Sequence, residues 1–352
     1  MLSLKDREWK PFQLGTLFEI HTGGDLILSR VEKGNIPIIS HSKMNNGVAV
    51  YTNLIKGRKL FDASMSISLA DRGNFCAYVQ RVDFYVGTRV KALVAKFRAN
   101  REILTFVCTL INNQSTRFSY GNNATDYTDK ITILIPITES DAPDWQFMEQ
   151  YIRELEQLQL EAYIGYAEKV LSETDGVEGV LPLREKEWKA FHIEKIATIE
   201  PGRDIYDAER RSGDTPYISS TSINNGIAHY VSNHNSTKEA NCISVNRNGS
   251  VGYAFYHPYE ALYSNDCRKL QLNQPSKYVS IFIAHQITMQ RKKYSYGYKM
   301  GTARLKRQLI LLPIGENNEP DWAYMEQYAK AITNQILMAY LKQKGCFKSL
   351  PA

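Results

Sequence analysis

The spacing of apolar and polar positions changes twice along the chain, and each change follows a copy of the same sequence motif. The motif reads PDWxxMEQY and begins at Pro143 and again at Pro320. A short apolar run of the kind that forms a strand comes just before each copy, at Leu134–Ile137 and Leu311–Ile314. After each copy, apolar residues recur every three or four positions, which predicts a long amphipathic helix. The Asp of each copy follows a Pro and is placed to cap the helix start.

The two predicted helices carry longer apolar stripes than a small domain needs. A helix over residues 144–171 would span about 42 Å at roughly 1.5 Å per residue. We therefore expect the two helices to pack on each other as an antiparallel coiled-coil spacer. The alternative, in which each helix covers only its own module, stays open. The residues predicted to pack the helices together are Met148, Tyr151, Leu155, Leu158, Ala162, Met325, Ala329, Ile332, Ile336 and Ala339.

The rest of the sequence is a duplication, which a search for internal repeats shows before any element is assigned. EWKPF at residues 8–12 recurs as EWKAF at 187–191, and Asn45-Asn46-Gly47 recurs as Asn224-Asn225-Gly226. This repeated order predicts two tandem globular modules, each closed by one of the helices. The predicted bounds are 1–143 for the first module, 144–180 for the central spacer helix and linker, 181–320 for the second module, and 321–352 for the C-terminal spacer helix.

Within each module the local pattern predicts a mixed α/β (α+β) fold. Short β-branched or alternating runs bounded by Gly, Asn and Asp indicate strands. In the first module these runs are Ile36–Ser40, Ser64–Leu69, Phe75–Val79 and Val90–Lys96, and in the second they are Tyr217–Ser220, Cys242–Val245, Val251–Tyr256 and Lys269–Leu272. Apolar residues at helical spacing predict one interior helix per module, at Arg101–Asn112 and Tyr278–Arg291. Asn46-Gly47 and Asn225-Gly226 predict tight turns, because both residue types tolerate positive φ.

Composition and charge narrow the possible functions. The chain has 352 residues, 43% apolar and 23% charged, which is typical of a soluble protein with two domains. No apolar run reaches the roughly 18 to 20 residues that span a bilayer, and we expect a cytoplasmic protein with free thiols. The net charge of +6 is uneven: the modules carry +5 and +6, residues 144–180 carry −7, and 321–352 carry +2. Basic modules are compatible with a polyanionic partner, and equally with ordinary surface scatter.

The motifs that accompany catalysis are missing from both modules. The sequence has no GxGxxG or GxxxxGK[ST] loop, and no Asn-Pro-Pro-aromatic tetrapeptide of the kind that amino-methyltransferases use. Its seven histidines are scattered, and His229 and His234 have no carboxylate or Cys at metal-ligand spacing. The sequence therefore favours a binding protein that holds no metal.

What remains is a set of polar and basic side chains in predicted loops. Arg can bridge the O6 and N7 acceptors of guanine and Asn can pair with adenine, whereas Lys and other Arg contact phosphates. For each single residue, an ordinary solvated or turn role is the competing interpretation. The predicted DNA-binding residues of the first module are Lys43, Asn45, Asn46, Arg72, Asn74, Arg89, Lys91, Asn122 and Asn123. Those of the second are Arg203, Arg210, Arg211, Asn224, Asn225, Arg247, Asn248, Asn265, Arg268, Lys269, Tyr296, Lys299, Arg304, Lys306 and Arg307.

Together these features resemble the specificity (S) subunits of Type I restriction–modification systems and the closely related subunits of Type IIB systems. The resemblance covers the whole chain and rests on a duplicated order: Trp-Lys-x-Phe…Ile at Trp9–Ile20 and Trp188–Ile199, then a Pro-x-Ile-Ser run, Asn-Asn-Gly, and a Leu-Pro-Ile strand before a long helix. It implies two target recognition domains that each read one half of a split double-stranded DNA sequence. It also implies helices that hold the half-sites apart and dock adenine methyltransferase subunits.

The resemblance further implies that the chemistry lies in partner subunits. S-adenosylmethionine and Mg would be bound there, by a methyltransferase alone or with a fused or separate nuclease, and this chain would bind no cofactor. We therefore expect a non-catalytic subunit that recognises a bipartite, asymmetric DNA target. One alternative is a stand-alone nuclease or methyltransferase, which turnover by the pure chain would reveal. Another is a decoy regulator that binds methyltransferase subunits without reading DNA.

Overall fold

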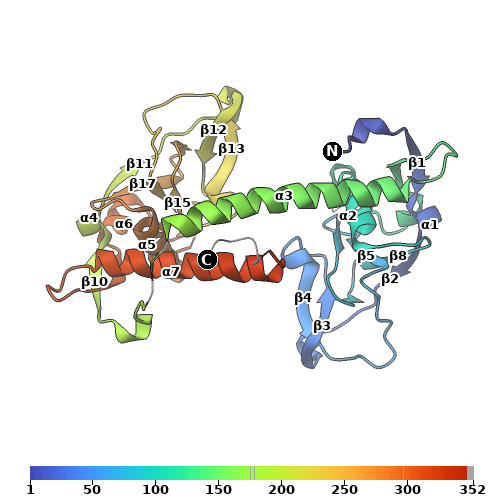
Figure 1. The fold of residues 1–352 in the computed structure, drawn as a ribbon, viewed down its shortest axis with the longest axis horizontal. Coiled ribbons are helices and arrows are strands. Elements are labelled where there is room, and N and C mark those ends of the chain that lie inside the picture. Colours follow the sequence, from blue (N-terminus) through green and yellow to red (C-terminus); the bar gives the residue numbers. More distant parts are fainter. Residues whose placement is uncertain (120, 175, 178, 296, 347–352) are drawn as a thin grey trace. The chain divides into compact units, whose positions relative to one another are not determined.

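The chain folds into two compact units, Met1–Tyr163 and Ile164–Ala352. The structure is a computed structural model, and it describes residues 1–119, 121–174, 176–177, 179–295 and 297–346. The same order of strands and helices occurs in each unit, except that unit 2 has the additional short helix α6 (Thr302–Arg307). Figure 1 labels the larger elements of both units. The predicted tandem duplication of a mixed α/β domain is thus confirmed, and the two units are described in turn.

Unit 1 contains three small sheets. The N-terminal strand β1 (Trp9–Gln13) pairs antiparallel with β9 (Thr132–Pro136), the strand that precedes the long helix. The four-stranded antiparallel sheet has the order β2–β8–β5–β6, with the bounds Phe18–Thr22, Val90–Ala95, Ser66–Ala70 and Cys76–Val79. The third sheet has the order β4–β3–β7, with the bounds Val48–Thr52, Lys33–Ile39 and Tyr85–Val86.

Strand β8 contributes side chains to two hydrophobic cores, because its side chains alternate between the two faces of its sheet. Leu93 and Ala95 lie in the main core of unit 1, whereas Val90 and Ala92 lie in a second cluster with Phe84. Helix α2 (Arg101–Asn112) covers the first face, and the β4–β3–β7 sheet contributes to the second cluster. A strand buried on both faces therefore reads as a nearly continuous apolar run, which is the pattern seen at 90–95.

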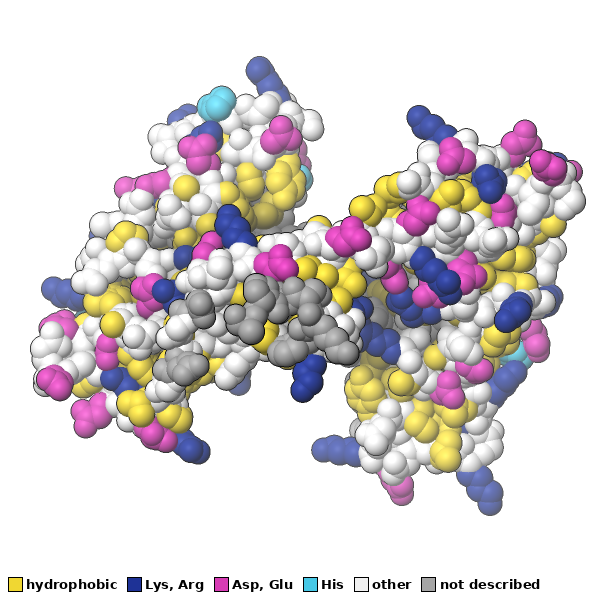
Figure 2. Space-filling model, viewed as in Figure 1, with side chains coloured by type: hydrophobic (Ala, Val, Ile, Leu, Met, Phe, Trp, Pro, Cys, Tyr) yellow, Lys and Arg dark blue, Asp and Glu magenta, His cyan; other side chains and the backbone are white. Residues whose placement is uncertain are grey.

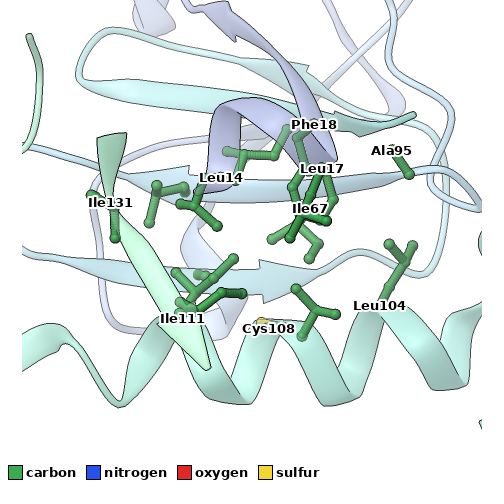
Figure 3. Packing of buried hydrophobic residues seen from close by; sticks show 14 of the residues in the cluster. Leu14, Leu17, Phe18, Ile67, Ala95, Leu104, Cys108, Ile111 and Ile131 are labelled. Atoms are coloured by element: carbon green, nitrogen blue, oxygen red, sulfur yellow. The ribbon is translucent and has the colours of Figure 1, made fainter. Parts of the chain in front are cut away.

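Helix α2 has the bounds that the sequence predicts. The Asn100 side chain caps it, accepting a hydrogen bond from Ile103 N at 2.9 Å. Its apolar stripe is buried, and Figure 3 shows Leu104, Cys108 and Ile111 pointing from the helix toward Ile67 of β5. Spacing of three and four residues puts these side chains on one face, so burying that face holds α2 to the sheet.

Unit 2 repeats this arrangement. Strand β10 (Trp188–His192) pairs with β18 (Leu309–Pro313), and α5 (Lys277–Met289) takes the place of α2. The four-stranded sheet β11–β17–β14–β15 has the bounds Ala197–Pro201, Cys267–Leu272, Cys242–Asn246 and Ala254–His257. The sheet β13–β12–β16 has the bounds Ile227–Val231, Ser212–Ile218 and Leu262–Tyr263. The short helices of the two units are α1 (Leu14–Leu17), α4 (Ile193–Ile196) and α6 (Thr302–Arg307).

Single turns of 3-10 helix complete the chain. Two of them are the predicted Asn-Gly turns, in which Asn46 and Asn225 have φ of 50° and 51° and the following glycines have φ of 78°. These turns, η3 (Asn45–Gly47) and η8 (Asn224–Gly226), are confirmed. The others are η1 (Leu4–Asp6), η2 (Leu28–Arg30), η4 (Ser115–Arg117), η5 (Thr128–Lys130), η6 (Leu183–Glu185), η7 (Asp207–Glu209) and η9 (Gln290–Lys293).

Some predicted strands begin later than expected, and β15 (Ala254–His257) shows why. Strand β15 starts at Ala254, whereas the pattern predicted a start at Val251. The residues before it form a tight turn instead, in which Gly252 N donates to Asn246 O at 2.9 Å. Gly249 and Gly252 both have positive φ in this turn, which an extended strand does not allow.

Both long helices begin where the PDW motif predicts. Helix α3 (Trp145–Glu173) is capped by Asp144, which accepts from Phe147 N at 2.9 Å. Helix α7 (Trp322–Gln343) is capped by Asp321, which accepts from Tyr324 N at 3.0 Å. The second carboxylate oxygen of each Asp contacts a cation of its own unit: Arg7 Nε lies 2.8 Å from Asp144 Oδ2, and Lys186 Nζ lies 2.8 Å from Asp321 Oδ2.

The residues predicted to pack the two helices together have varied surroundings. Met148 and Met325 lie in the cores of units 1 and 2, with Tyr151 packed against the core of unit 1. Ala329 is buried, Leu155 and Ile332 are half-buried, and Ala162 and Ala339 are exposed. Leu158 is 45% exposed and Ile336 is 63% exposed. Packing between the two helices stays a prediction.

The buried stripe of α7 includes the predicted Met325 and Ala329. Further along the helix, Leu337 and Leu341 are buried, whereas Ile336 and Ala339 are exposed. Unit 2 also includes the last turns of α3, where Ala167 and Val170 are buried. Asn334 of α7 donates through Nδ2 to Thr174 O at 3.2 Å, so this end of α3 lies beside α7 (Figure 1).

Candidate nucleic-acid interface

Four loops of unit 1 come together at one end of its four-stranded sheet. Asp71 N donates to Arg89 O at 3.3 Å, and Ala124 N donates to Asp71 O at 3.0 Å. Asn74 Nδ2 donates to His41 O at 2.9 Å, which ties in the loop before η3. We call this surface the loop face of unit 1, made by residues 40–47, 71–75, 87–89 and 121–125.

Unit 2 builds the corresponding loop face with the same kinds of contact. Arg247 N donates to Asp266 O at 2.8 Å, and Ser250 N donates to Ser220 O at 3.0 Å. Arg268 Nε donates to Thr302 Oγ1 at 2.6 Å, which brings in the start of α6. The loop face of unit 2 is made by residues 219–226, 247–253, 264–266 and 297–302. The duplication has thus preserved the backbone of this surface.

Several predicted DNA-binding residues lie exposed on the loop face of unit 1. The side chains of Lys43, Arg72 and Arg89 are exposed, with Arg89 in a left-handed turn at φ 64°. Asn45 and Asn46 are exposed in η3, so they serve the turn and are also open to a ligand. These five residues are free to meet DNA without any change of fold.

The remaining predicted residues of unit 1 hold the fold. Asn74 ties two loops together as described, and Asn123 Oδ1 accepts from Thr125 N at 3.2 Å. Asn122 Nδ2 donates to Arg117 O at 2.9 Å. Lys91 is 5% exposed, and its ammonium lies 3.4 Å from the carboxylate of Asp71. Because Lys91 is enclosed and paired, we propose no DNA contact for it.

Four predicted residues of unit 2 form one cluster. Arg247 and Arg268 both donate to the backbone oxygen of Asn265, at 3.3 and 2.9 Å. Asn248 Nδ2 donates to the carboxylate of Asp266, while its own Oδ1 is buried without a hydrogen-bond partner. Arg247, Asn248 and Asn265 are half-buried and Arg268 is 6% exposed, so the cluster reaches from the surface into unit 2.

Lys269 has a structural role. It is 5% exposed, with Nζ 2.9 Å from Glu200 Oε2 and also in contact with the carboxylate of Glu239. Strand alternation puts it on the sheet face opposite to that of Arg268. A lysine that is enclosed and paired with two carboxylates has no free charge for a phosphate, so we propose no DNA contact for it.

Three further arginines surround a hollow of about 430 Å³ in unit 2. Arg203 and Arg211 are exposed at its rim. Arg210 is engaged: its Nε donates to Ile205 O at 3.0 Å, its NH1 lies 2.8 Å from His229 Nε2, and it also pairs with Asp207. The hollow is polar, and its lining also includes the acids Asp204 and Glu209, so the three arginines do not give it a single sign of charge.

Three of the predicted DNA-binding residues, Arg304, Lys306 and Arg307, lie on α6. Arg304 stacks over the Tyr298 ring at 4.0 Å from its centroid and donates to Lys299 O at 2.8 Å. Lys306 and Arg307 are exposed. Tyr296 lies outside the described residues. Asn224 and Asn225 are exposed in η8, as their counterparts are in unit 1.

Charge alone does not mark an interface. On the face seen in Figure 2, Lys and Arg side chains are interspersed with Asp and Glu over both units and form no single-sign field. The local arrangement of cations and their partners therefore carries more information than the net charge of each unit.

Potential metal ligands are dispersed in the described residues, and several thiols are buried. No three His, Cys, Asp or Glu side chains in the described ranges come together as metal ligands would. Burial raises the pKa of the thiols of Cys108, Cys242 and Cys267 to about 12, which keeps them protonated. Nor does any helix in the described part of the chain have the length and apolar character needed to cross a membrane.

Some residues of the loop faces were missed at the sequence level. Asp71, Asp266, Thr302 and His41 position the predicted residues, and none of them stands in a recognisable motif. Aligning the duplicated strands residue by residue would have drawn attention to Asp71, which aligns with Arg247, and to Asp266, which aligns with Arg89. The two copies carry opposite charges at each of these aligned pairs.

Comparison with known proteins agrees with this architecture. The family model of the Type I restriction modification DNA specificity domain matches twice, over residues 6–165 and 185–339. The chain is 31% identical over 339 residues to the Type II restriction enzyme BgcI specificity subunit S.BcgI of Heyndrickxia coagulans, covering 94% of this chain and 96% of that protein. The Type I restriction-modification S subunit from M. genitalium has a similar fold, with a TM-score of 0.51 at 14% identity, covering 99% of this chain and 95% of the other.

The chain belongs to the family of Type I restriction modification DNA specificity domains, and it carries two of them in tandem. It is a DNA specificity subunit of a restriction–modification system. The resemblance inferred from the duplicated motifs is thereby confirmed. The family is defined by DNA specificity, which fits a subunit without catalysis of its own.

Proposed function

We propose that this subunit reads a bipartite, asymmetric DNA target, with one unit bound to each half-site. The observation that carries the proposal is the pair of loop faces. Equivalent backbone contacts build both loop faces, at the same end of the four-stranded sheet of each unit. The side chains of the two loop faces differ. A shared frame with different polar groups is what two readers of different short sequences need, because base identity is read by side chains in the major groove.

The residues proposed to contact DNA are those that the structure leaves accessible. In unit 1 they are the exposed cations Lys43, Arg72 and Arg89 and the turn residues Asn45 and Asn46. In unit 2 they are Arg203, Arg211, Asn224, Asn225, Arg247, Asn248, Arg304, Lys306 and Arg307. Contacts to phosphates would set the register on the duplex, and contacts to base edges would set the sequence.

We further propose that the long helices dock methyltransferase subunits. Exposed apolar side chains on both helices support this, since Leu158 of α3 and Ile336 of α7 are 45% and 63% exposed. A docking site would join such side chains into a continuous apolar patch, since single exposed apolar residues are ordinary on protein surfaces. Catalysis, S-adenosylmethionine and Mg would then belong to the partner, an adenine methyltransferase with or without a nuclease, acting on DNA in the cytoplasm.

Selection from a random DNA library tests the proposal. The subunit is co-expressed with the adjacently encoded methyltransferase, and the purified complex is used to enrich bound duplexes. Two short conserved blocks at constant spacing are the expected result. An intact complex that enriches no sequence would contradict it, and would favour a regulator that binds methyltransferase subunits without reading DNA.

A further inference from the structure

A buried arginine of unit 2 has only neutral hydrogen-bond acceptors. Arg268 is 6% exposed, and it donates to Thr302 Oγ1 at 2.6 Å, Asn265 O at 2.9 Å and Cys267 O at 2.8 Å. Within the described part of the chain, no carboxylate forms an ion pair with it. Buried charges in proteins are normally paired, so this guanidinium lacks the partner that its burial demands.

A second guanidinium adds to the unpaired positive charge. Arg247 donates to the same Asn265 backbone oxygen at 3.3 Å and forms no ion pair within the described ranges. The nearest acid, Asp266, accepts a hydrogen bond from Asn248 Nδ2. Burial, and after it the charge of Arg247, lowers the pKa of Arg268. Two like charges therefore meet at Asn265, where an anion would stabilise both.

Unit 1 shows how the same site looks when it is neutralised. Lys91 and Arg268 are equivalent, because Lys91 pairs with Leu69 and Arg268 pairs with Val245 in the same strand register. Asp71 and Arg247 lie two residues beyond these partners. Their backbone N–H groups make equivalent contacts, Asp71 N to Arg89 O before β8 and Arg247 N to Asp266 O before β17.

The charges at these equivalent positions differ. In unit 1, Asp71 supplies the carboxylate that neutralises the buried cation, with its Oδ2 3.4 Å from Lys91 Nζ. In unit 2, the equivalent position carries Arg247, a second cation. The carboxylate of unit 2 lies instead at Asp266, the position of Arg89 in unit 1, where it accepts a hydrogen bond from Asn248 and forms no ion pair with Arg268 among the described residues.

We propose that Arg247 and Arg268 form an anion site on the loop face of unit 2, which takes an electronegative group of bound DNA. The group would be either a backbone phosphate or the O6/N7 edge of a guanine, since both present paired acceptors that match a guanidinium. This inference rests on the proposed function. Arg247 is half-buried, so the site opens to the surface through it.

A single exchange gives unit 2 the carboxylate that unit 1 carries at the aligned position 71. Arg247→Asp places a carboxylate at the position of Asp71, where it neutralises Arg268 from within the protein. The matched control is Arg184→Ala, which removes an arginine whose side chain is 84% exposed. Both variants are assayed as the full chain in complex with methyltransferase subunits, on the DNA target obtained by selection.

The expected loss of affinity is about ten- to a hundredfold for Arg247→Asp, with Arg184→Ala within about twofold of the parent. The pattern of the loss distinguishes the two sources of the anion. If a guanine is bound, only targets with G·C at one position of the unit 2 half-site lose affinity. If a phosphate is bound, all targets lose it, and the slope of log K against log salt concentration shrinks by about one.

Thermal unfolding of the same variant separates a ligand site from a structural one. Supplying a buried cation with a carboxylate is expected to raise the unfolding midpoint by roughly 2–4 °C or more. A lower midpoint would show that Arg247 supports the fold, and would overturn the proposal. Unchanged DNA affinity of the Arg247→Asp complex, with target selection intact, would also overturn the proposal. Absence of any sequence preference in the parent complex would instead contradict the proposed function.

Discussion

The buried ion pair of unit 1 gives a prediction whose size can be worked from the structure. Lys91 and Asp71 have side chains that are 7% and 3% exposed, with Nζ and Oδ2 3.4 Å apart. Replacing Asp71 by Asn preserves the shape of the side chain and removes its charge. The ammonium of Lys91 then keeps one described side-chain partner, Thr22 Oγ1 at 3.3 Å.

The loss in unfolding free energy should be about 3–5 kcal/mol, which is typical of breaking a buried pair by removing one partner. For a unit of this size, that corresponds to a fall in the unfolding midpoint of roughly 6–20 °C. Urea and thermal unfolding of the full chain, followed by circular dichroism, measure both quantities. The matched control is Asp141→Asn, which breaks the exposed pair with Lys10 (side chains 63% and 45% exposed) and should cost at most about 1 kcal/mol.

A double variant tests the reason for the loss. Combining Asp71→Asn with Lys91→Met removes both charges and should restore most of the lost stability, because no unpaired ion is left in the interior. If Asp71→Asn costs no more than Asp141→Asn, or if Lys91→Met fails to rescue it, the pair is not the element that neutralises this site.

Two further predictions concern buried groups of unit 2. Burial lowers the pKa of His257 to about 4, so between about pH 6.5 and 4 the unfolded chain binds the proton first and stability falls as pH falls. We expect this group to lower the unfolding free energy by about 2 kcal/mol at pH 5 relative to pH 7. The unfolding free energy of His257→Gln should therefore depend less steeply on pH. The same pH dependence in both proteins would contradict the lowered pKa of His257. Gly252→Ala should destabilise more than Gly57→Ala, since both glycines have positive φ but only at Gly252 would the new Cβ meet a neighbour, Arg291 Cβ at 2.8 Å. Equal losses of unfolding free energy in urea would show that the positive φ alone causes the destabilisation.

Local signals in the sequence predicted the elements well. The bounds of α2 agree because Asn100 caps it and its apolar spacing is unbroken. Asp144 and Asp321 cap the long helices as the repeated motif indicates. Such features depend on residues within a few positions of one another. Composition and periodicity are therefore sufficient to predict them.

The candidate site could be predicted only in part, because exposure depends on tertiary pairing. Lys91 and Lys269 occur in strand segments as polar residues among apolar ones, and nothing nearby shows that distant carboxylates enclose them. The later part of the α7 stripe differs from its predicted position because Ile336 and Leu337 are equally apolar, and only packing decides which is buried. Of the neutral acceptors of Arg268, Asn265 and Cys267 are close in sequence, whereas Thr302 lies 34 positions away.

Exchange of one unit tests the central claim most directly. Residues 1–143 are replaced by the corresponding residues of another member of the family, and the DNA target of the co-expressed complex is determined again by selection. If each unit reads one half-site, one block of the target changes while the other block and the spacing stay the same. A change in both blocks, or in neither, would contradict recognition by independent units.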